Sequence, residues 1–176
     1  MAAKVGQEAD MNRRKFLLVS GTAVAVLSIL FGYRRMRVVG EAQAETFEVT
    51  KTETEWHAIL SDAQYAVLRE EDTERPGTSP LLHEKRKGTF HCAGCDLPVY
   101  SSETKFESGT GWPSFWESLP QAIGTREDTS FFMTRTECHC RRCGGHFGHI
   151  FDDGPPPTGK RHCINGLALT FTPATA

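Results

Sequence analysis

The sequence predicts a mainly β, antiparallel domain that follows two short helices. Helical patterns are confined to residues 53–72, whereas from about Thr89 onward short apolar runs rich in β-branched and aromatic residues are bounded by Gly, Pro, Asp or Ser. Three consecutive prolines, Pro155–Pro157, predict a loop, because proline offers no backbone donor to a sheet. The strongest strand segments are 89–91, 98–100, 131–134, 149–151 and 168–171.

The two helical patterns lie next to each other. The first covers residues 54–60, and Ser61-Asp62-Ala63-Gln64 has the form of a capping box that opens the second, which ends near Glu70. Tyr65 and Leu68 recur at helical spacing, so we expect them to pack against the sheet. The order of elements therefore predicts helices first and then a compact antiparallel β domain.

Charge divides the chain into a basic leader and an acidic body. Residues 1–44 hold seven of the 20 Lys and Arg residues and three of the 22 Asp and Glu residues. Residues 45–176 therefore hold 13 basic and 19 acidic residues, a net charge of −6 with histidine neutral. A body this acidic is a poor candidate for binding nucleic acid through its phosphates.

The leader, residues 1–44, resembles a twin-arginine export signal. Arg13-Arg14 precedes a moderately apolar run over 16–31, which is shorter than a membrane span of roughly 20 residues. Ala42-Gln43-Ala44 offers a cleavage site with small residues, and export of the folded domain 45–176 to the periplasm is expected. Three arginines after the apolar run leave two alternatives open: an uncleaved inner-membrane anchor, or a buried helix with basic flanks.

Four of the six cysteines form two C-x-x-C pairs. Cys92 and Cys95 form the first pair, Cys140 and Cys143 the second, and glycines accompany both. Two such turns complete a tetrahedral four-thiolate site that suits Zn²⁺, and a closed site of this kind is structural. Two disulfides, a redox-active pair and iron in the same site remain as alternatives.

Cys163 is the candidate for chemistry. Lys160, Arg161 and His162 precede it directly, and basic neighbours favour the reactive thiolate. Upstream, His146 and His149 are followed by Asp152 and Asp153, and such a cluster can supply a proton donor and the carboxylate that orients it. A structural role or adventitious metal binding would explain the histidines equally well.

A glycine-rich aromatic loop is the third candidate feature. Gly109 and Gly111 flank Thr110, and Pro113 follows Trp112. Aromatic stretches usually belong to a core, but this arrangement suggests an indole that forms the wall of a site. Such a wall could hold the methyl group of a thioether sulfoxide.

Taken together, these segments resemble the methionine sulfoxide reductase B family, from about Thr54 to Phe171. The matching stretches are 108–115, 135–137, 143–154, 157–159 and 161–165. The resemblance implies two antiparallel sheets in a tent-like or barrel-like arrangement, with flanking N-terminal helices and the structural zinc. It also implies reduction of the R epimer of methionine sulfoxide in oxidised proteins or peptides, with a thioredoxin-like or other thiol reductant.

The resemblance also implies a role for each site residue. Cys163 would attack the sulfoxide sulfur and become a sulfenic acid. His149, with His146 and Asp153 nearby, would protonate the leaving oxygen. Arg161 and Asn165 would hold the thiolate and position the site, while Trp112 would pack on the substrate methyl group.

The chain departs from the family pattern at two positions. Many family members have a resolving cysteine where this chain has Thr110, so a disulfide cannot form there. Cys138 is an additional cysteine and a candidate resolving thiol, although it lies two residues before Cys140 and could equally be a buried, inert thiol. Direct reduction of the sulfenic acid by an external thiol is the remaining route.

Two other functions account for part of the sequence. A zinc-ribbon binding module would explain the four metal cysteines but not Cys163 and its surroundings. A peroxide sensor or disulfide-exchange protein would use Cys163 together with Cys138. Reactivity of the Cys163 thiol separates the binding module from the enzyme, and a Cys138–Cys163 disulfide after oxidation would identify the exchange protein.

Overall fold

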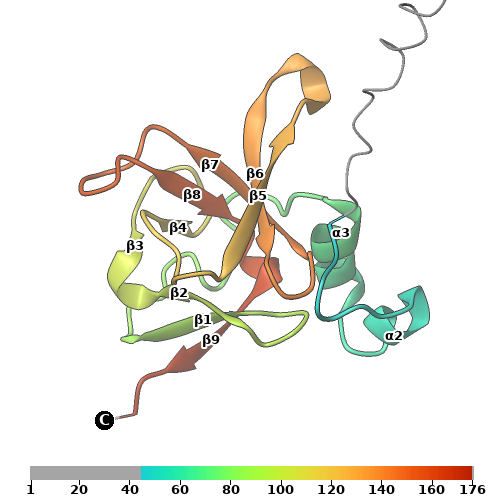
Figure 1. Ribbon diagram of the computed structural model, residues 1–176. Coiled ribbons are helices and arrows are strands. Elements are labelled where there is room, and N and C mark those ends of the chain that lie inside the picture. Colours follow the sequence, from blue (N-terminus) through green and yellow to red (C-terminus); the bar gives the residue numbers. More distant parts are fainter. Residues whose placement is uncertain (1–44, 176) are drawn as a thin grey trace, which may run out of the picture. The chain divides into compact units, whose positions relative to one another are not determined.

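Two antiparallel β-sheets form the body of the protein in the computed structural model, which describes residues 45–175 (Figure 1). The predicted leader, 1–44, lies outside the described residues. Among the described residues, no helix is both long and apolar enough to cross a membrane. The prediction of a mainly β fold with two antiparallel sheets is confirmed.

The smaller sheet has three strands in the order β2-β1-β9, and the larger has six in the order β3-β4-β8-β7-β6-β5. The strands of the smaller sheet are β1 (Gly88–Cys92), β2 (Pro98–Ser101) and β9 (Leu169–Pro173). Those of the larger sheet are β3 (Lys105–Phe106), β4 (Ser114–Phe115), β5 (Ile123–Asp128), β6 (Arg135–Cys140), β7 (His146–Phe151) and β8 (Arg161–Ile164). Short 3-10 turns follow three of the strands: η1 (Ser102–Thr104), η2 (Ser130–Phe132) and η3 (Gly166–Ala168).

Two capped helices precede the sheets. The capping box predicted at Ser61 and Gln64 opens α3 (Asp62–Glu70), which confirms the prediction. A second capping box, from Thr52 to Glu55, opens α2 (Glu53–His57). Leu68 of α3 is buried and approaches the turn before β7, so this helix does pack against the larger sheet.

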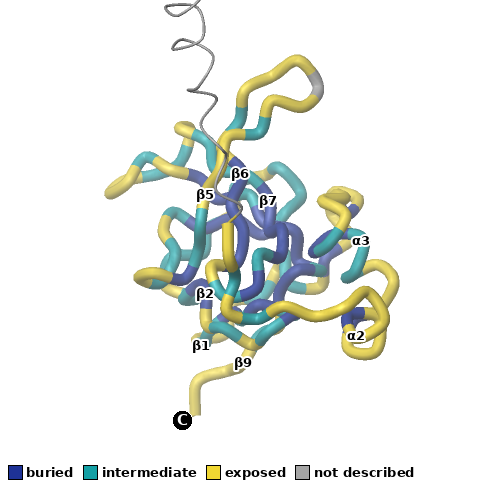
Figure 2. Tube along the Cα trace, turned by 45° about the vertical axis from the view of Figure 1, so that its right-hand side comes forward, coloured by how far each residue is buried: buried dark blue, intermediate teal, exposed yellow. Residues whose placement is uncertain are grey.

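The core lies between the two sheets (Figure 2). Tyr100 of the smaller sheet stacks on Phe115 of the larger at a ring distance of 4.3 Å, and Phe90 meets Phe115 edge-on at 5.0 Å. These three rings are fully buried, together with Ile164 of β8. Burial of large aromatic side chains dominates the energetics of such a core, so β4 and β8 are held firmly at its centre.

The strand predictions succeed at four positions and fail at one. Segments 89–91, 98–100, 149–151 and 168–171 all overlap strands. The segment 131–134 was expected to be a strand, but it forms η2 and the tip of the β5–β6 hairpin. Phe132 has φ +59° and a fully exposed side chain there, because the turn places this apolar run away from the core.

Candidate active site

Cys163 lies on β8 in a row of side chains that crosses the larger sheet. Direct partners on neighbouring strands present their side chains on the same face, about 5 Å apart. The register therefore places Cys163 between Ser114 of β4 and His149 of β7. From β3 to β5 the complete row is Phe106, Ser114, Cys163, His149, Glu137 and Arg126.

Close contact between β7 and β8 depends on Gly148. Its φ is +151°, and a Cβ atom at this position would lie 2.1 Å from the carbonyl oxygen of Cys163. Any larger residue would push the two strands apart. Gly148 thus keeps His149 beside Cys163.

His149 is oriented by Asp128, the last residue of β5. The Nε2 atom of His149 lies 2.8 Å from Oδ2 of Asp128, and the same oxygen accepts a hydrogen bond of 2.6 Å from Arg135. The pKa of His149 is below its ordinary value, because burial lowers it more than the hydrogen bond to Asp128 raises it. Hydrogen bonds from Ser130 and then from His149 hold the pKa of Asp128 well below its usual range.

His146 has a carboxylate partner of its own. Its Nδ1 atom lies 2.6 Å from Oε1 of Glu137, which also forms an ion pair with Arg126. Burial raises the pKa of Glu137, but its hydrogen bonds to His146 and Arg126 outweigh this effect, so the net shift is downward. The rings of His146 and His149 meet edge-on at 5.6 Å. Each histidine is therefore held by a separate carboxylate.

Asp153 does not orient the histidines, contrary to the arrangement expected from the sequence. It forms a two-pronged ion pair with Arg161, at 2.8 Å to Nε and 2.9 Å to Nη2. Asp152 forms an ion pair with Lys160. Both aspartates therefore pair with basic residues at the start of β8 and not with the histidines of β7. The loop between β7 and β8 folds back, which brings Lys160 and Arg161 next to Asp152 and Asp153.

Only one of the three basic neighbours of Cys163 acts on its thiol as expected. Burial raises the pKa of the thiol, while hydrogen bonding from Thr110 and the positive charge of Arg161 lower it. His162 faces the core on the opposite side of β8, near the hydroxyl of Tyr100, and burial lowers its pKa to about 4. His162 is therefore neutral near pH 7 and supplies no positive charge to Cys163.

Trp112 and Asn165 are tied together by a residue that the sequence did not single out, Glu74. The indole Nε1 of Trp112 donates to the carbonyl of Glu74 at 3.0 Å, and Oδ1 of Asn165 accepts from the backbone N–H of Glu74, also at 3.0 Å. The Asn165 side chain also donates to the carbonyl of Phe147 at 3.0 Å. The side-chain oxygen and one N–H of Asn165 are thus both hydrogen-bonded to backbone, which ties the end of β8 to Glu74 and Phe147.

The Glu74 carboxylate completes this connection. It is buried and accepts hydrogen bonds from the backbone N–H groups of Gly166 and Leu167, just after β8. Burial raises the pKa of Glu74 more than these hydrogen bonds lower it. No spacing or periodicity in the sequence distinguishes this residue, since its partners lie about 90 positions away.

A pocket of about 690 Å³ opens beside the histidine pair. Its walls come from the end of α3 and from the β5–β6 hairpin. His146, His149 and both of their carboxylate partners line it, together with Arg126 and Arg135. Cys163 and Trp112 do not line this pocket, so it opens the histidine pair and its carboxylates to solvent rather than the sulfur itself.

Cys138 lies on the other face of the larger sheet. It pairs with Gly148, which in turn pairs with Ile164, so its side chain points into the core while Cys163 points away from it. Cys138 is fully buried, and burial raises the pKa of its thiol. This arrangement offers no path to a Cys138–Cys163 disulfide without rearrangement of β6 or β8.

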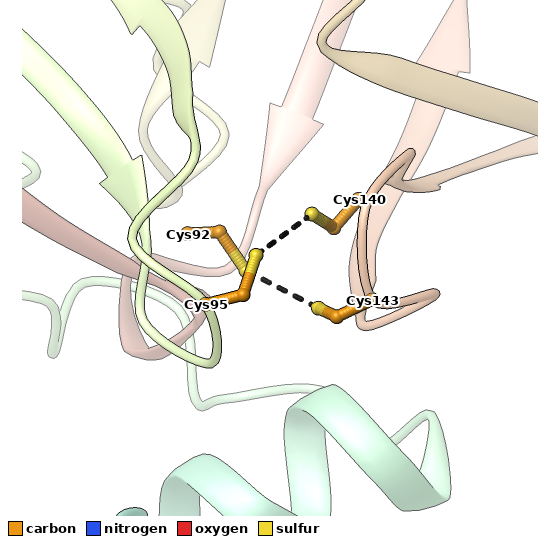
Figure 3. Close-up of side chains that lie close together, drawn as sticks. All are labelled: Cys92, Cys95, Cys140 and Cys143. Carbon is orange, nitrogen blue, oxygen red and sulfur yellow. Dashed lines mark hydrogen bonds between the residues drawn. The ribbon is translucent and has the colours of Figure 1, made fainter. Parts of the chain in front are cut away.

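The four other cysteines converge as the two C-x-x-C pairs predict (Figure 3). Their Sγ atoms lie within 4.8 Å of one another, with 3.7 Å between Cys92 and Cys143 and 3.5 Å between Cys95 and Cys140. A tetrahedron with metal–sulfur bonds of about 2.3 Å has edges of about 3.8 Å, so the cluster has the dimensions of a four-thiolate metal site. All six cysteines of the chain are free of disulfides.

Comparison with known proteins agrees with this geometry. A model of the SelR domain matches residues 60–173. A protein of Methanosarcina barkeri named peptide methionine sulfoxide reductase MsrB is 52% identical over 124 residues, which cover 70% of this chain and 87% of the relative. Proteins of the same name from Agrobacterium fabrum and Pseudomonas putida are 48% and 52% identical, and the match covers 72% of this chain and 94% and 96% of theirs. The chain belongs to the SelR-domain family of methionine sulfoxide reductases B.

Proposed function

We propose that the protein reduces the R epimer of methionine sulfoxide in oxidised proteins to methionine. The observation that carries the proposal is the row in which Cys163 and His149 are direct neighbours, with Arg161 two residues before Cys163 on the same face. A thiol, a proton donor and a fixed positive charge are the groups that such a reduction requires. Membership of the family supports the same reaction.

The first step transfers oxygen from the substrate to the enzyme. The thiolate of Cys163 attacks the sulfoxide sulfur, and protonated His149 gives its proton to the sulfoxide oxygen. The substrate S–O bond and the transient bond between the two sulfurs both break as the hydroxyl group passes to Sγ, so that Cys163 becomes a sulfenic acid and methionine is released. The substrate gains the two electrons that the cysteine loses, and His149 regains a proton from solvent through the pocket beside it.

Neighbouring residues prepare this step without taking part in bond changes. Arg161, fixed by Asp153, favours the thiolate electrostatically. Asp128 orients His149 through its Nε2 atom, while His146, held by Glu137, packs edge-on against the His149 ring. Trp112, anchored through its indole N–H, supplies an apolar surface for the substrate methyl group.

Regeneration of Cys163 requires thiols from outside the chain. Thr110 cannot resolve a sulfenic acid, and Cys138 is buried on the opposite face. One external thiol condenses with the sulfenic acid to a mixed disulfide and water, and a second thiol releases Cys163. A thioredoxin-like protein or a small thiol would serve as this reductant.

A stereospecific assay tests the proposal. The purified protein is given separated R and S epimers of a peptide methionine sulfoxide with dithiothreitol. We expect turnover of the R epimer alone, and complete loss of turnover in Cys163→Ser with an unchanged circular dichroism spectrum. Turnover of neither epimer by the folded protein would refute the proposed function.

We also propose that the four-cysteine cluster holds one structural Zn²⁺. The support is its fit to a tetrahedral thiolate site, formed by two turns from different sheets. Four protein ligands leave no position for substrate, so the ion would supply rigidity and no chemistry of its own. It would tie the end of β1 to the end of β6.

We further propose that the protein is exported to the periplasm by the twin-arginine route. The support is Arg13-Arg14 ahead of the apolar run 16–31. In fractionated bacterial cells, the full chain should reach the periplasm, while the double variant Arg13→Lys, Arg14→Lys should stay in the cytoplasm. Equal export of both would refute this route, and the mass of the exported protein shows whether the leader is cleaved.

A further inference from the structure

Three hydroxyl groups form a chain that ends at the Cys163 sulfur. Oγ1 of Thr110 lies 3.9 Å from Sγ of Cys163, within hydrogen-bond reach for sulfur. Ser108 Oγ lies 2.9 Å from Thr110 Oγ1 and 2.7 Å from Ser114 Oγ. At the far end, Ser114 Oγ donates to the carbonyl of Trp112 at 3.1 Å.

Each of these three hydroxyl groups has a single proton, which limits the directions in which its hydrogen bonds can run. A hydroxyl group donates one hydrogen bond and can accept others. With Cys163 as a neutral thiol, the bonds run outward, from the thiol to Thr110, then to Ser108 and Ser114, and finally to the carbonyl of Trp112. With Cys163 as a thiolate, rotation of the same hydroxyls reverses the three bonds that join the sulfur and the hydroxyl groups, so that Thr110 donates to the sulfur, Ser108 to Thr110 and Ser114 to Ser108. Ser114 then gives up its bond to the carbonyl of Trp112.

We propose that the chain Ser114–Ser108–Thr110 positions and stabilises the Cys163 thiolate by reversing its hydrogen bonds when the thiol loses its proton. The inference rests on the proposed function only in taking Cys163 as the nucleophile. Thr110 and Ser108 are positioning residues, because they act on the reacting sulfur and not on the substrate. Hydrogen bonds to a charged acceptor are stronger than those to a neutral one, so the chain favours the thiolate.

The local backbone holds Thr110 in place. Gly109 and Gly111 flank it with φ values of +72° and +95°, which only glycine adopts readily. A Cβ atom on Gly111 would lie 2.7 Å from Cβ of Pro76, so the loop packs tightly against the segment that carries Glu74. Thr110 cannot withdraw from Cys163 without disturbing this contact.

The chain of hydroxyl groups matters because burial disfavours the thiolate form of Cys163. The Cys163 thiol is partly buried, and burial raises its pKa, while Thr110 and Arg161 act in the opposite direction. Arg161 is already held by Asp153, whose negative charge lessens its effect on the thiolate. Thr110 is a neutral donor and brings no counter-charge of this kind, so its hydrogen bond stabilises the thiolate without an opposing contribution.

The pH dependence of alkylation tests this inference without substrate. The full-length protein is treated with iodoacetamide from pH 6 to pH 11, and modification of the Cys163 peptide is followed by mass spectrometry. We expect Thr110→Val, which keeps the shape but removes the hydroxyl, to raise the apparent thiol pKa by about one unit, the loss of one charge-assisted hydrogen bond. Alkylation at pH 7 should slow about tenfold.

Three further variants make the test specific. Thr110→Ser restores a hydroxyl and should return the profile to that of the wild type. Ser108→Ala should give a smaller shift in the same direction, since it removes only the support of Thr110. Thr125→Val is the matched control, an exposed threonine on β5, and should change nothing.

An unchanged alkylation profile in both Thr110→Val and Ser108→Ala would overturn the inference. A profile shifted equally by Thr110→Val and Thr110→Ser would also overturn it, because packing and not the hydroxyl would then set the pKa. Neither outcome depends on methionine sulfoxide turnover. The alkylation profiles can therefore contradict the role of Thr110 and Ser108 while the reductase activity holds, and the reverse is also possible.

Discussion

Cys163 and His149 are direct cross-strand partners on β8 and β7. Hydrogen bonds of the sheet fix this relationship, so the proposed nucleophile and the proposed proton donor keep their spacing through the strand pairing itself. Gly148 permits the close approach of the strands, and Asp128 sets the orientation of the imidazole. The proposed chemistry therefore depends on the register of the sheet and on the residues that hold Cys163 and His149 in place.

Substitution Asp128→Asn should alter the pH profile of kcat/KM for the R epimer. The active form has Cys163 as a thiolate and His149 protonated, while burial lowers the pKa of His149 and raises that of Cys163 from their ordinary values, so the pKa of His149 is the lower of the two. The fraction of enzyme in this form is constant between the two values and falls on either side, which gives a broad plateau. Removing the carboxylate lowers the pKa of His149 further, so the plateau should fall and the acid limb should move to lower pH.

Asp152→Asn is the control for this experiment, because that carboxylate is exposed and pairs with Lys160. Its profile should match that of the wild type. A wild-type plateau and acid limb in Asp128→Asn would contradict the orienting role of Asp128.

Removal of the metal should unfold the domain. Binding energy at a closed four-thiolate site is also folding energy, so a strong chelator should abolish the cooperative thermal transition seen by circular dichroism. Cys140→Ala should lose the bound zinc, whereas Cys138→Ala, two residues away but outside the cluster, should retain one zinc per chain. Unchanged thermal stability after verified loss of the metal would contradict a structural role.

Glu74→Gln should destabilise the fold and weaken catalysis together. One of the two carboxylate oxygens that accept backbone N–H groups becomes an NH₂ group, which leaves a buried donor without an acceptor. The free energy of unfolding, measured by urea denaturation, should fall by about 1–3 kcal/mol. Because the Glu74 backbone also holds Trp112 and Asn165, kcat/KM should fall as well.

The exposed Glu117 provides a matched comparison for this substitution. Glu117→Gln should leave both the unfolding free energy and kcat/KM within experimental error of the wild type. Equal effects of the two substitutions would show that the buried position of Glu74 is unimportant.

The sequence predicted those parts of the fold and site that have local patterns. Each of these parts is recognised from a few consecutive residues: the C-x-x-C pairs, the capping box at Ser61 and the glycine-rich loop around Thr110. Strand β5 was missed because Ile123–Asp128 is a polar edge strand with little apolar alternation. Strand β8 was missed because it has only four residues and begins with a charged residue, Arg161. This arginine is buried through its ion pair with Asp153, which the sequence pattern does not reveal.

The carboxylates that orient the histidines were beyond sequence reasoning for a different reason. Asp153 is close to His149 in the chain, but Asp128 is close in space, and only the pairing of β5, β6 and β7 reveals this. Glu137 stands in the stretch 135–137 that resembled the family, yet no local feature assigned it to His146. Partners that depend on sheet register cannot be derived from spacing along one strand.

Single-turnover oxidation tests the proposed role of Cys163 without any reductant. The reduced protein is mixed with one equivalent of the R or the S epimer of a peptide methionine sulfoxide without added thiol, and sulfenic acid is trapped with dimedone and located by mass spectrometry. We expect one adduct, on Cys163, together with one equivalent of methionine from the R epimer and none from the S epimer. Formation of methionine without an adduct on Cys163, or an equal reaction with both epimers, would contradict it.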